Sequence, residues 1–317
     1  MMTSIGQQLR DLITPRARVI IDNDFSGDPD GLVQLVHHLL SPSVDIRVVI
    51  GSHLRPGDPF DPSDRTADNA RAAAERVLAI MNRTLPVVAG SNEALVNAHT
   101  PRRSAATDAI IAEALRDDTD LPLYLACGAG LTEIASALLL EPRIAERVVV
   151  VWIGGPEHAG LALAPPGSTG PEYNLAIDIP AAQAVFASGV PIWQVPRDAY
   201  RQTLYSWAEL FRRVAPAGAI GLHLVDALSQ VARMASVRGV PLGETYIMGD
   251  SPLVLLTALQ SAFEPDPSSS DYVLRPTPSI RSDGGYGEPA ADAAPLRVYT
   301  RLDTRLLFAD FEAKLGG

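Results

Sequence analysis

Short apolar runs rich in β-branched residues alternate along this chain with longer amphipathic segments. This alternation is typical of strands joined by crossover helices in a mainly parallel sheet that is covered on both faces. The run at 18–22 (RVIID) indicates the first strand, and the four consecutive valines at 148–151 indicate a strand buried on both faces. We expect further strands at 44–50, 86–89, 121–126 and 190–195, and helices at 31–40, 66–81, 106–115, 132–140 and 180–188.

Residues 203–214 continue the alternation, but the last hundred residues of the chain have a different pattern. Longer helical patterns appear there at 217–235, 251–262 and 302–315. Two other segments, 271–282 and 296–299, could pair as antiparallel strands. The sequence contains no repeat at a fixed period and no long polar linker. We therefore expect a single α/β domain over residues 1–317, with a helical and β addition at its C-terminal end.

Composition narrows the possible functions. The chain has 317 residues, of which 47% are hydrophobic and 20% charged, so it can bury a large core and is neither disordered nor fibrous. The 26 basic residues are outnumbered by 37 acidic ones, which gives a net charge of −11. Such an acidic surface repels phosphate backbones and anionic lipids, so neither nucleic acid nor membrane is an expected partner.

Cysteine content and apolar runs bear on the compartment. Cys127 is the single cysteine, so no internal disulfide can form, and one thiol is too few for a structural zinc site. Residues 1–15 lack the continuous apolar stretch of a signal peptide, and no run reaches the roughly 18 apolar residues of a membrane span. These features predict a cytoplasmic protein.

Four aspartates follow the first predicted strand. Asp22, Asp24, Asp28 and Asp30 fall within nine residues, at the carboxyl end of an apolar run and the start of a helical pattern. Ligands of open α/β sheets bind at that edge. Helix capping explains one or two of these acids. Because no Lys or Arg lies nearby in sequence, the group favours a hard divalent cation held by carboxylate oxygens.

An Asp-x-Asp at the end of a first strand has two familiar interpretations. One is a phosphatase of the haloacid dehalogenase type, in which Asp22 would be the nucleophile with Mg²⁺ beside it. The other is the N-terminal loop of the inosine-uridine preferring nucleoside hydrolases. The phosphatase needs a basic residue in its core, usually a lysine, and the only lysine of this chain is Lys314, three residues from the end. This favours the hydrolase.

Four segments, in the family's order, resemble nucleoside hydrolase motifs. Residues 20–35 (IIDNDFSGDPDGLVQL) resemble the Asp-rich loop D-x-D-P-G-x-D-D, and residues 125–135 (LACGAGLTEIA) resemble T-G-P-L-T-N-I-A. Residues 172–174 (EYN) are similar to the E-F-N block, and residues 248–252 (MGDSP) align with the later H-D-P segment. The chain is thereby identified as a divergent member of this family, which implies a mainly parallel, Rossmann-like sheet flanked by helices.

The resemblance implies a Ca²⁺ site and a general base. Asp24 falls at the aspartate that contacts both the calcium ion and the attacking water, and Asp250 falls at the later metal-binding aspartate. The main-chain carbonyl ligand falls on Gly128, or on Cys127 if the loop is offset by one residue. Asp30 is expected on the metal.

The resemblance also implies ribose contacts. Glu172 and Asn174 match ligands of the sugar hydroxyls, and Asp28 is expected on the metal or on the 2′- and 3′-hydroxyls. Ser52 and His53 stand where the family commonly has Asn after the second strand, so we include them among the substrate contacts. An acidic pocket of this kind suits a substrate on whose ring positive charge develops during reaction.

One departure concerns the leaving group. The histidine that precedes the late aspartate in base-protonating members is replaced here by Gly249. Other side chains must then contact the departing base. His158, on the Pro/Gly-rich loop 157–171, and Tyr246 are the candidates we single out.

The sequence therefore predicts a metal-dependent glycosidase that cleaves ribonucleosides to ribose and free base. A small-molecule ribonucleoside is the expected partner, and a role in purine or pyrimidine salvage and a homodimeric or homotetrameric state are implied by the resemblance. A ribose- or sugar-binding protein on the same scaffold, without catalysis or with altered specificity, and the phosphatase remain as alternatives. The base preference is not readable, because the residues around the base lie on the most divergent loops.

Overall fold

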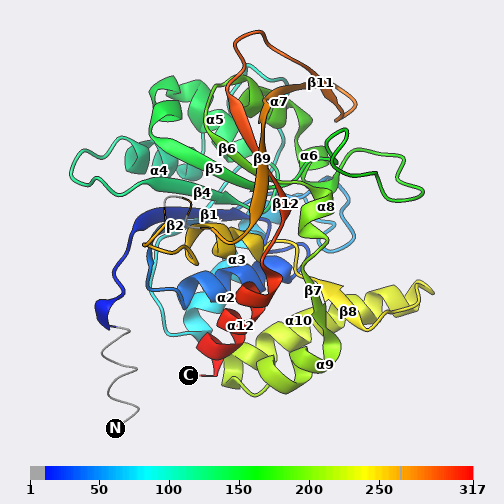
Figure 1. Cartoon of the computed structure of the whole chain (residues 1–317). Coiled ribbons are helices and arrows are strands. Elements are labelled where there is room, and N and C mark those ends of the chain that lie inside the picture. Colours follow the sequence, from blue (N-terminus) through cyan, green and yellow to red (C-terminus); the bar gives the residue numbers. More distant parts are fainter. Residues whose placement is uncertain (1–10, 265, 267, 317) are drawn as a thin grey trace.

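The computed structural model of the chain describes residues 11–264, 266 and 268–316, and it contains an eight-stranded central sheet (Figure 1). Neighbouring strands are parallel from β3 through β12, and β9 pairs antiparallel with β12 at one edge. The predicted α/β class with a mainly parallel sheet is confirmed. The strand order is β3 (Val87–Ala89), β2 (Val44–Gly51), β1 (Ala17–Asn23), β4 (Leu123–Cys127), β5 (Val148–Ile153), β6 (Ile192–Val195), β12 (Pro295–Arg301) and β9 (Asp271–Pro276).

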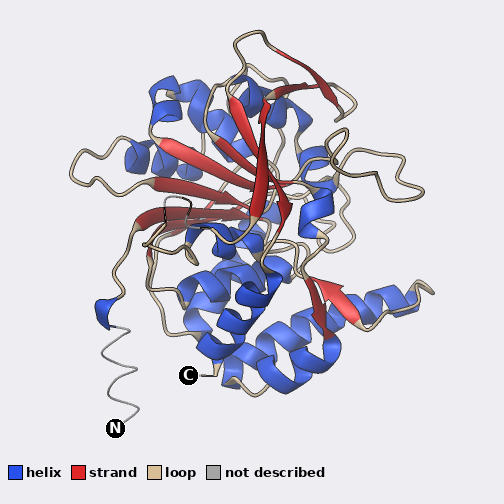
Figure 2. Cartoon of the chain, in the orientation of Figure 1, coloured by secondary structure: helices blue, strands red, loops and turns tan. Residues whose placement is uncertain are grey.

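Helices cover both faces of the sheet (Figure 2). Strand β1 contributes to both layers because its side chains alternate: Val19 and Ile21 pack into one core cluster and Ile20 into the other. Together the two clusters form one α/β/α sandwich. One face carries α4 (Ala105–Ala114), α5 (Thr132–Leu140), η1 (Pro142–Glu146) and α7 (Ile179–Ala187); the other carries α2 (Asp30–Leu39), α3 (Thr66–Ile80), α10 (Gly218–Val237), α11 (Pro252–Thr257) and α12 (Thr304–Leu315).

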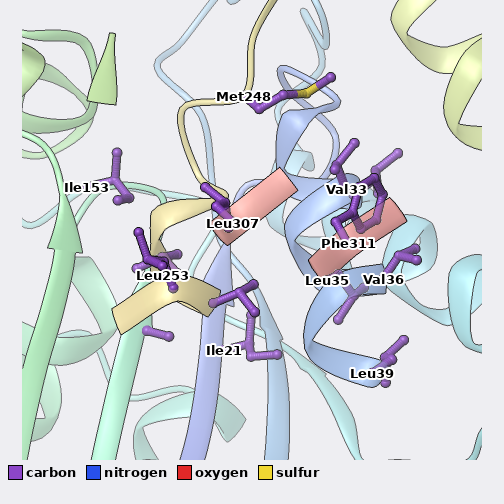
Figure 3. Close-up of a cluster of buried hydrophobic side chains, with 14 of the residues drawn as sticks. Ile21, Val33, Leu35, Val36, Leu39, Ile153, Met248, Leu253, Leu307 and Phe311 are labelled. Carbon is purple, nitrogen blue, oxygen red and sulfur yellow. The ribbon is translucent and has the colours of Figure 1, made fainter. Parts of the chain in front are cut away.

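Helix α2 is buried along its whole length. Its apolar side chains, among them Leu35 and Val36, pack in one cluster with Ile21 of β1, Leu253 of α11 and Phe311 of α12 (Figure 3). A helix that is enclosed on every side must satisfy its polar side chains inside the protein. The polar residues of α2 are therefore of interest for the site at its N-terminus.

The C-terminal region differs in part from the predicted elements. The segment predicted as one strand at 271–282 is divided into β9 and β10 (Pro278–Ile280), which forms a separate hairpin with β11 (Tyr286–Pro289). Pro276 and Pro278 flank the break, and proline supplies no amide donor to continue a ladder. The predicted pairing with 296–299 is confirmed, but β12 also pairs with β6 and so extends the central sheet.

One further prediction was wrong in extent, and one segment is divided among several elements. The helix expected at 251–262 ends at Thr257, because residues 261–264 are exposed and add no buried apolar surface. Residues 203–214 do not form one element. They contain β7 (Leu204–Ser206), which pairs with β8 (Thr245–Ile247), followed by α9 (Trp207–Glu209) and the π-helical η2 (Leu210–Val214). The short helices α6 (Tyr173–Ile177) and α8 (Arg197–Tyr200) complete the fold.

Some expectations concern the chain's ends. Residues 1–10, which make up most of the segment assessed as a signal peptide, lie outside the described residues, as do 265, 267 and 317. A single domain over all of 1–317 thus stays a prediction. Among the described helices, none is long and apolar enough to cross a membrane.

Candidate active site

The site lies at the carboxyl ends of the central parallel strands. The register places Asn23 of β1 opposite Gly51 of β2, and Asp22 opposite Cys127 of β4. The residues that follow these strands therefore meet at one edge of the sheet. Gly128 fits there only because it lacks a side chain: a Cβ would lie 2.4 Å from Nδ2 of Asn23 and 2.9 Å from Cγ of Asp250.

Asp22 is part of the framework behind this edge. Its carboxyl group is completely buried and accepts a hydrogen bond from the hydroxyl of Ser52. Its Oδ2 meets no hydrogen-bond partner among the described residues. Burial raises the pKa of Asp22 to about 8, against the opposing effect of the Ser52 hydrogen bond. A carboxyl group enclosed in this way is not exposed for nucleophilic attack.

Asn23 joins two of the predicted site residues. Its Oδ1 accepts from the backbone amide of Asp24 at 2.8 Å, and its Nδ2 donates to Oδ2 of Asp250 at 2.9 Å. The sequence interpretation did not include Asn23. The signal that could have indicated it is an amide side chain placed between two aspartates at the end of a buried strand.

Four of the other predicted acids, all aspartates, form one electrostatic group. The backbone amide of Asp250 donates to Oδ2 of Asp30 at 3.0 Å, and that of Asp30 donates to Oδ1 of Asp28 at 3.3 Å. Burial raises the pKa of each, and neighbouring carboxylates raise it further; the pKa of Asp250 is raised to about 7, and those of Asp24 and Asp30 lie well above the ordinary value. The structure thus brings Asp24, Asp28, Asp30 and Asp250 together.

This acidic group fits a divalent cation by its chemistry. Its side chains offer only oxygen atoms as metal ligands. No Lys or Arg of the described residues donates a hydrogen bond to any of its four carboxylates. As the side chains stand, however, no group of three or more His, Cys, Asp or Glu residues in the described part of the chain is arranged to hold a metal ion. Burial, and after it the proximity of other carboxylates, raises the pKa values of these acids, and a bound cation would oppose both effects.

Asp58 is a fifth acid near this group that the sequence did not indicate. It is buried, and its charge adds to the rise in the pKa of Asp24. The hydroxyl of Tyr173 donates to its Oδ2, and the guanidinium of Arg55 lies 4.5 Å from the centre of the Tyr173 ring. Asp58 belongs to the long loop after β2, whose sequence carries no regular pattern to place it.

The Glu172-Tyr173-Asn174 segment lies next to Gly128. The side chain of Asn174 donates from Nδ2 to the backbone oxygens of Gly128, at 3.0 Å, and Ile153, at 2.8 Å. Glu172 is buried and caps α6: its Oε2 accepts from the amides of Gly155, at 2.7 Å, and Leu175, at 3.0 Å.

The remaining contacts of Glu172 link it to the acidic group. Its Oε1 accepts from the hydroxyl of Tyr200 at 3.0 Å, a contact that the sequence did not indicate. Burial raises the pKa of Glu172, and its charge in turn contributes to the raised pKa of Asp250. Glu172 is therefore close enough to Asp250 for the charges of the two carboxylates to interact.

Ser52 and His53 hydrogen-bond to the framework. Ser52 donates to Asp22, as described, while Nε2 of His53 lies 2.8 Å from Oγ1 of Thr132. Thr132 in turn donates to Asp178 at 2.7 Å. The predicted substrate contacts of Ser52 and His53 stay predictions.

The two candidates for the leaving group lie in different places. The hydroxyl of Tyr246, on β8, donates to Oδ1 of Asp28 at 2.6 Å, and the Trp207 ring meets the Tyr246 ring edge to face at 5.5 Å. His158 instead hydrogen-bonds to Gln194 at 2.8 Å and stacks on Tyr286 at 4.4 Å. The structure thus brings Tyr246 to the acidic group, whereas the contacts of His158 lie on the side of β6 and β11.

Known proteins resemble the chain at both the sequence and the structural level. A model of the inosine-uridine preferring nucleoside hydrolase family matches residues 19–291. A protein described as an inosine-uridine preferring nucleoside hydrolase from Leishmania major is 38% identical over 107 residues, which cover 32% of each chain. One from Crithidia fasciculata is 42% identical over 76 residues, which cover 24% of this chain and 22% of that one. These curated relatives are thus matched over a third of their length or less.

Solved structures match over nearly the whole fold. A plant nucleoside hydrolase superposes with a TM-score of 0.71 at 17% identity, covering 95% of this chain and 99% of its own. A purine-preferring ribonucleoside hydrolase from Gardnerella vaginalis superposes with a TM-score of 0.70 at 18% identity, covering 95% and 98%. At these identities the superpositions establish the fold.

Proposed function

Because this chain belongs to the inosine-uridine preferring nucleoside hydrolase family, we propose that it hydrolyses the N-glycosidic bond of ribonucleosides to give ribose and free base. The observation that carries this proposal is the acidic group itself. Five acids at the carboxyl edge of the sheet act on one another's charge: Asp24 and Asp28 from the loop after β1, Asp30 at the first position of α2, Asp250 just before α11, and Glu172. By resemblance, these acids align with the family's Asp-rich loop, E-F-N block and H-D-P segment, with Asp28-Pro29-Asp30 in place of adjacent aspartates.

A divalent cation, Ca²⁺, would balance the acidic group. Asp24, Asp30, Asp250 and the backbone oxygen of Gly128 would hold it, with Asp28 as a further ligand or a ribose contact. Calcium takes six to eight oxygen ligands, which leaves places for water and sugar hydroxyls. When bound, the cation would lower the pKa of a coordinated water.

Asp24 would act as the general base. Its backbone is fixed by Asn23, and no side chain of the described residues donates to its carboxylate. A bound cation would reverse the rise in its pKa, because an opposite charge favours the ionised carboxylate. Asp24 would then be ready to accept a proton from the attacking water at neutral pH.

The sugar would be bound and stabilised by neighbouring acids. Cleavage of an N-ribosidic bond develops positive charge on the ribose ring. Asp28 and Glu172 would accept hydrogen bonds from the sugar hydroxyls and stabilise that charge, with Asn174, Ser52 and His53 as further contacts.

Tyr246 is our candidate for contact with the departing base. Burial and the charges of Asp28 and Asp30 raise the pKa of Tyr246, so its hydroxyl keeps its proton. Gly249 stands beside this region, and a Cβ at 249 would lie 3.2 Å from Oδ2 of Asp30. A side chain at 249 would therefore point at the acidic group, so its absence removes the family's usual acid.

The first test is incubation of the purified protein with a panel of purine and pyrimidine ribonucleosides. We expect free base to be released, and Ca²⁺ binding to be measurable by calorimetry. Absence of both would overturn the proposal. The same panel would report the base preference, and sedimentation would test the proposed homodimer or homotetramer.

The absence of a side chain at Gly249 favours a second candidate, a sugar-binding protein on the same scaffold. Binding of Ca²⁺ and ribose without turnover would support it. A phosphatase would instead release phosphate from a generic ester with Mg²⁺ and lose this activity in Asp22→Asn. The enclosed position of Asp22 argues against that outcome.

A further inference from the structure

A series of buried hydrogen bonds connects the acidic group to the core. Nδ2 of Asn23 donates to Oε1 of Gln34 at 3.3 Å, and Nε2 of Gln34 donates to Nδ1 of His38, one turn later on α2. Nε2 of His38 meets Oγ1 of Thr257 at 2.9 Å, and that hydroxyl donates to the backbone oxygen of Leu253 at 2.6 Å.

The last hydrogen bond, to the backbone oxygen of Leu253, determines which atom donates and which accepts in every other bond of the series. A backbone oxygen only accepts, so the Thr257 hydroxyl gives its proton to Leu253 and must accept from His38. His38 therefore carries its proton on Nε2 and accepts at Nδ1. The amide nitrogen of Gln34 then faces His38, which leaves its oxygen to accept from Asn23.

This direction sets how the Asn23 side chain is turned. With its nitrogen facing Gln34, Asn23 also presents that nitrogen to Asp250, and it turns its oxygen to the amide of Asp24. A flipped amide would place its oxygen against the Asp250 carboxylate. The orientation of one amide thus determines two contacts inside the proposed site.

The surroundings of these hydrogen bonds hold them in place. Gln34 and His38 are fully buried on α2, whose apolar side chains pack in the cluster of Figure 3, so water cannot replace a lost partner there. Burial lowers the pKa of His38 to about 3, so the ring stays neutral with a single N–H. A neutral ring can serve as acceptor on one side and donor on the other.

We propose that Gln34 and His38 are positioning residues, which fix the relative placement of Asp24 and Asp250 by holding the amide of Asn23. This inference rests on the proposed function for its effect on turnover. Neither residue hydrogen-bonds to a carboxylate of the acidic group. Each acts through Asn23.

The neighbouring residue His37 provides a matched control. It is equally buried on the same helix, but its Nε2 bonds to Asp310 at 2.8 Å and its ring packs against Phe311 at 5.2 Å. These contacts lead to α12 and away from Asn23. His37→Leu should therefore lower the stability of the protein much as His38→Leu does, but it should leave the hydrogen bonds from Asn23 to Thr257 intact.

The kinetic test compares Gln34→Met and His38→Leu with His37→Leu. We expect kcat to fall roughly tenfold in the first two, the lower end of the loss that follows removal of a direct partner of a metal ligand, because both residues act through Asn23. KM should change much less, and His37→Leu should keep a kcat near that of the wild type. His38→Asn, which can still accept from Gln34, should recover part of the loss. Equal losses in His37→Leu and His38→Leu, or no loss in either of the first two variants, would refute the inference.

Two measurements are independent of turnover. Nitrogen-15 NMR of histidine-labelled wild-type protein should show His38 as the neutral Nε2–H tautomer, assigned by loss of its signals in His38→Asn. An Nδ1–H tautomer would exchange the donor and acceptor roles along this series of hydrogen bonds and would overturn the inference. Calorimetry with Ca²⁺ alone should show weaker binding in Gln34→Met than in His37→Leu, and equal affinities would count against it.

These measurements separate the two proposals. If the wild type releases no base, the proposed function fails, and the tautomer and Ca²⁺ affinities still decide the inference. If His38→Leu does not fold, Gln34→Met and the wild-type NMR decide it.

Discussion

Tyr246 and Asp28 are joined by a hydrogen bond of 2.6 Å across 218 positions of the sequence. The contact ties β8, in the two-stranded sheet that it forms with β7, to the Asp-rich loop after β1. It lowers the pKa of Asp28 against the larger opposing effect of burial. The tyrosine thereby helps to set both the charge and the direction of an acid proposed to contact metal or ribose.

Replacing this tyrosine should impair the site. In Tyr246→Phe the Asp28 carboxylate loses the hydroxyl donor and keeps the weaker bond from the Asp30 amide, so its pKa should rise and its orientation should loosen. We expect kcat/KM for ribonucleosides to fall roughly tenfold, in line with loss of a hydrogen bond to a charged group. Tyr205→Phe is the control, since the Tyr205 hydroxyl bonds to Glu312 elsewhere in the core. An unchanged kcat/KM in Tyr246→Phe would remove this residue from the site.

Asp24→Asn tests the general base. The variant keeps the shape of the side chain but cannot accept the proton, so kcat should fall by about 10²- to 10⁴-fold. Circular dichroism should show an intact fold. Asp64→Asn, at an exposed acid of the loop after β2, should leave kcat unchanged. A loss of only a few fold in Asp24→Asn would mean that the base is misassigned.

Gly128→Ala tests the close approach of three segments at the sheet edge. The added Cβ would overlap Nδ2 of Asn23, so Asn23 and Asp250 must shift. We expect a loss of about 1 to 3 kcal/mol in the free energy of unfolding, together with a lower kcat. Gly170→Ala, where a Cβ would meet nothing within 4 Å, is the control. Equal stability of the two variants would show that the site tolerates the methyl group.

Asp22 should make the stability of the protein depend on pH. Its pKa is about 8 in the folded protein and should return to about 3.9 in the unfolded chain. Between these values the folded protein binds more protons, so the free energy of unfolding falls as pH rises from about 4 to about 8. In a chelating buffer, calorimetry should show a lower Tm at pH 8 than at pH 5. Asp22→Asn should flatten this slope, by up to about 1.4 kcal/mol per pH unit; parallel slopes would contradict the assignment.

The sequence was informative where a residue's environment depends on its neighbours in the chain. The valine-rich run of β5 is buried on both faces of the sheet, so its composition alone identifies it. The spacing of the acids after β1 likewise indicated a charged site at a strand end. The family motifs then connected that loop to Asp250 and Asn174, which no local pattern could have done.

Residues whose role comes from distant contacts were missed. Asn23 matters because of Gln34 on the next helix and Asp250 far along the chain. Tyr200 reaches Glu172 from α8, a helix of one turn that has no apolar period to predict it. His158 was singled out because its loop is rich in glycine and proline, but loop composition does not determine which way a side chain points.

Cys127 gives the protein an internal reporter. It is the residue before Gly128, it is fully buried, and burial raises its pKa well above the ordinary range, so its thiol is inert while the sheet edge is closed. A thiol reagent can alkylate Cys127 only when β4 separates locally from its neighbouring strands. The alkylation rate of the unmodified protein would therefore measure how often the active-site edge opens, with no label introduced.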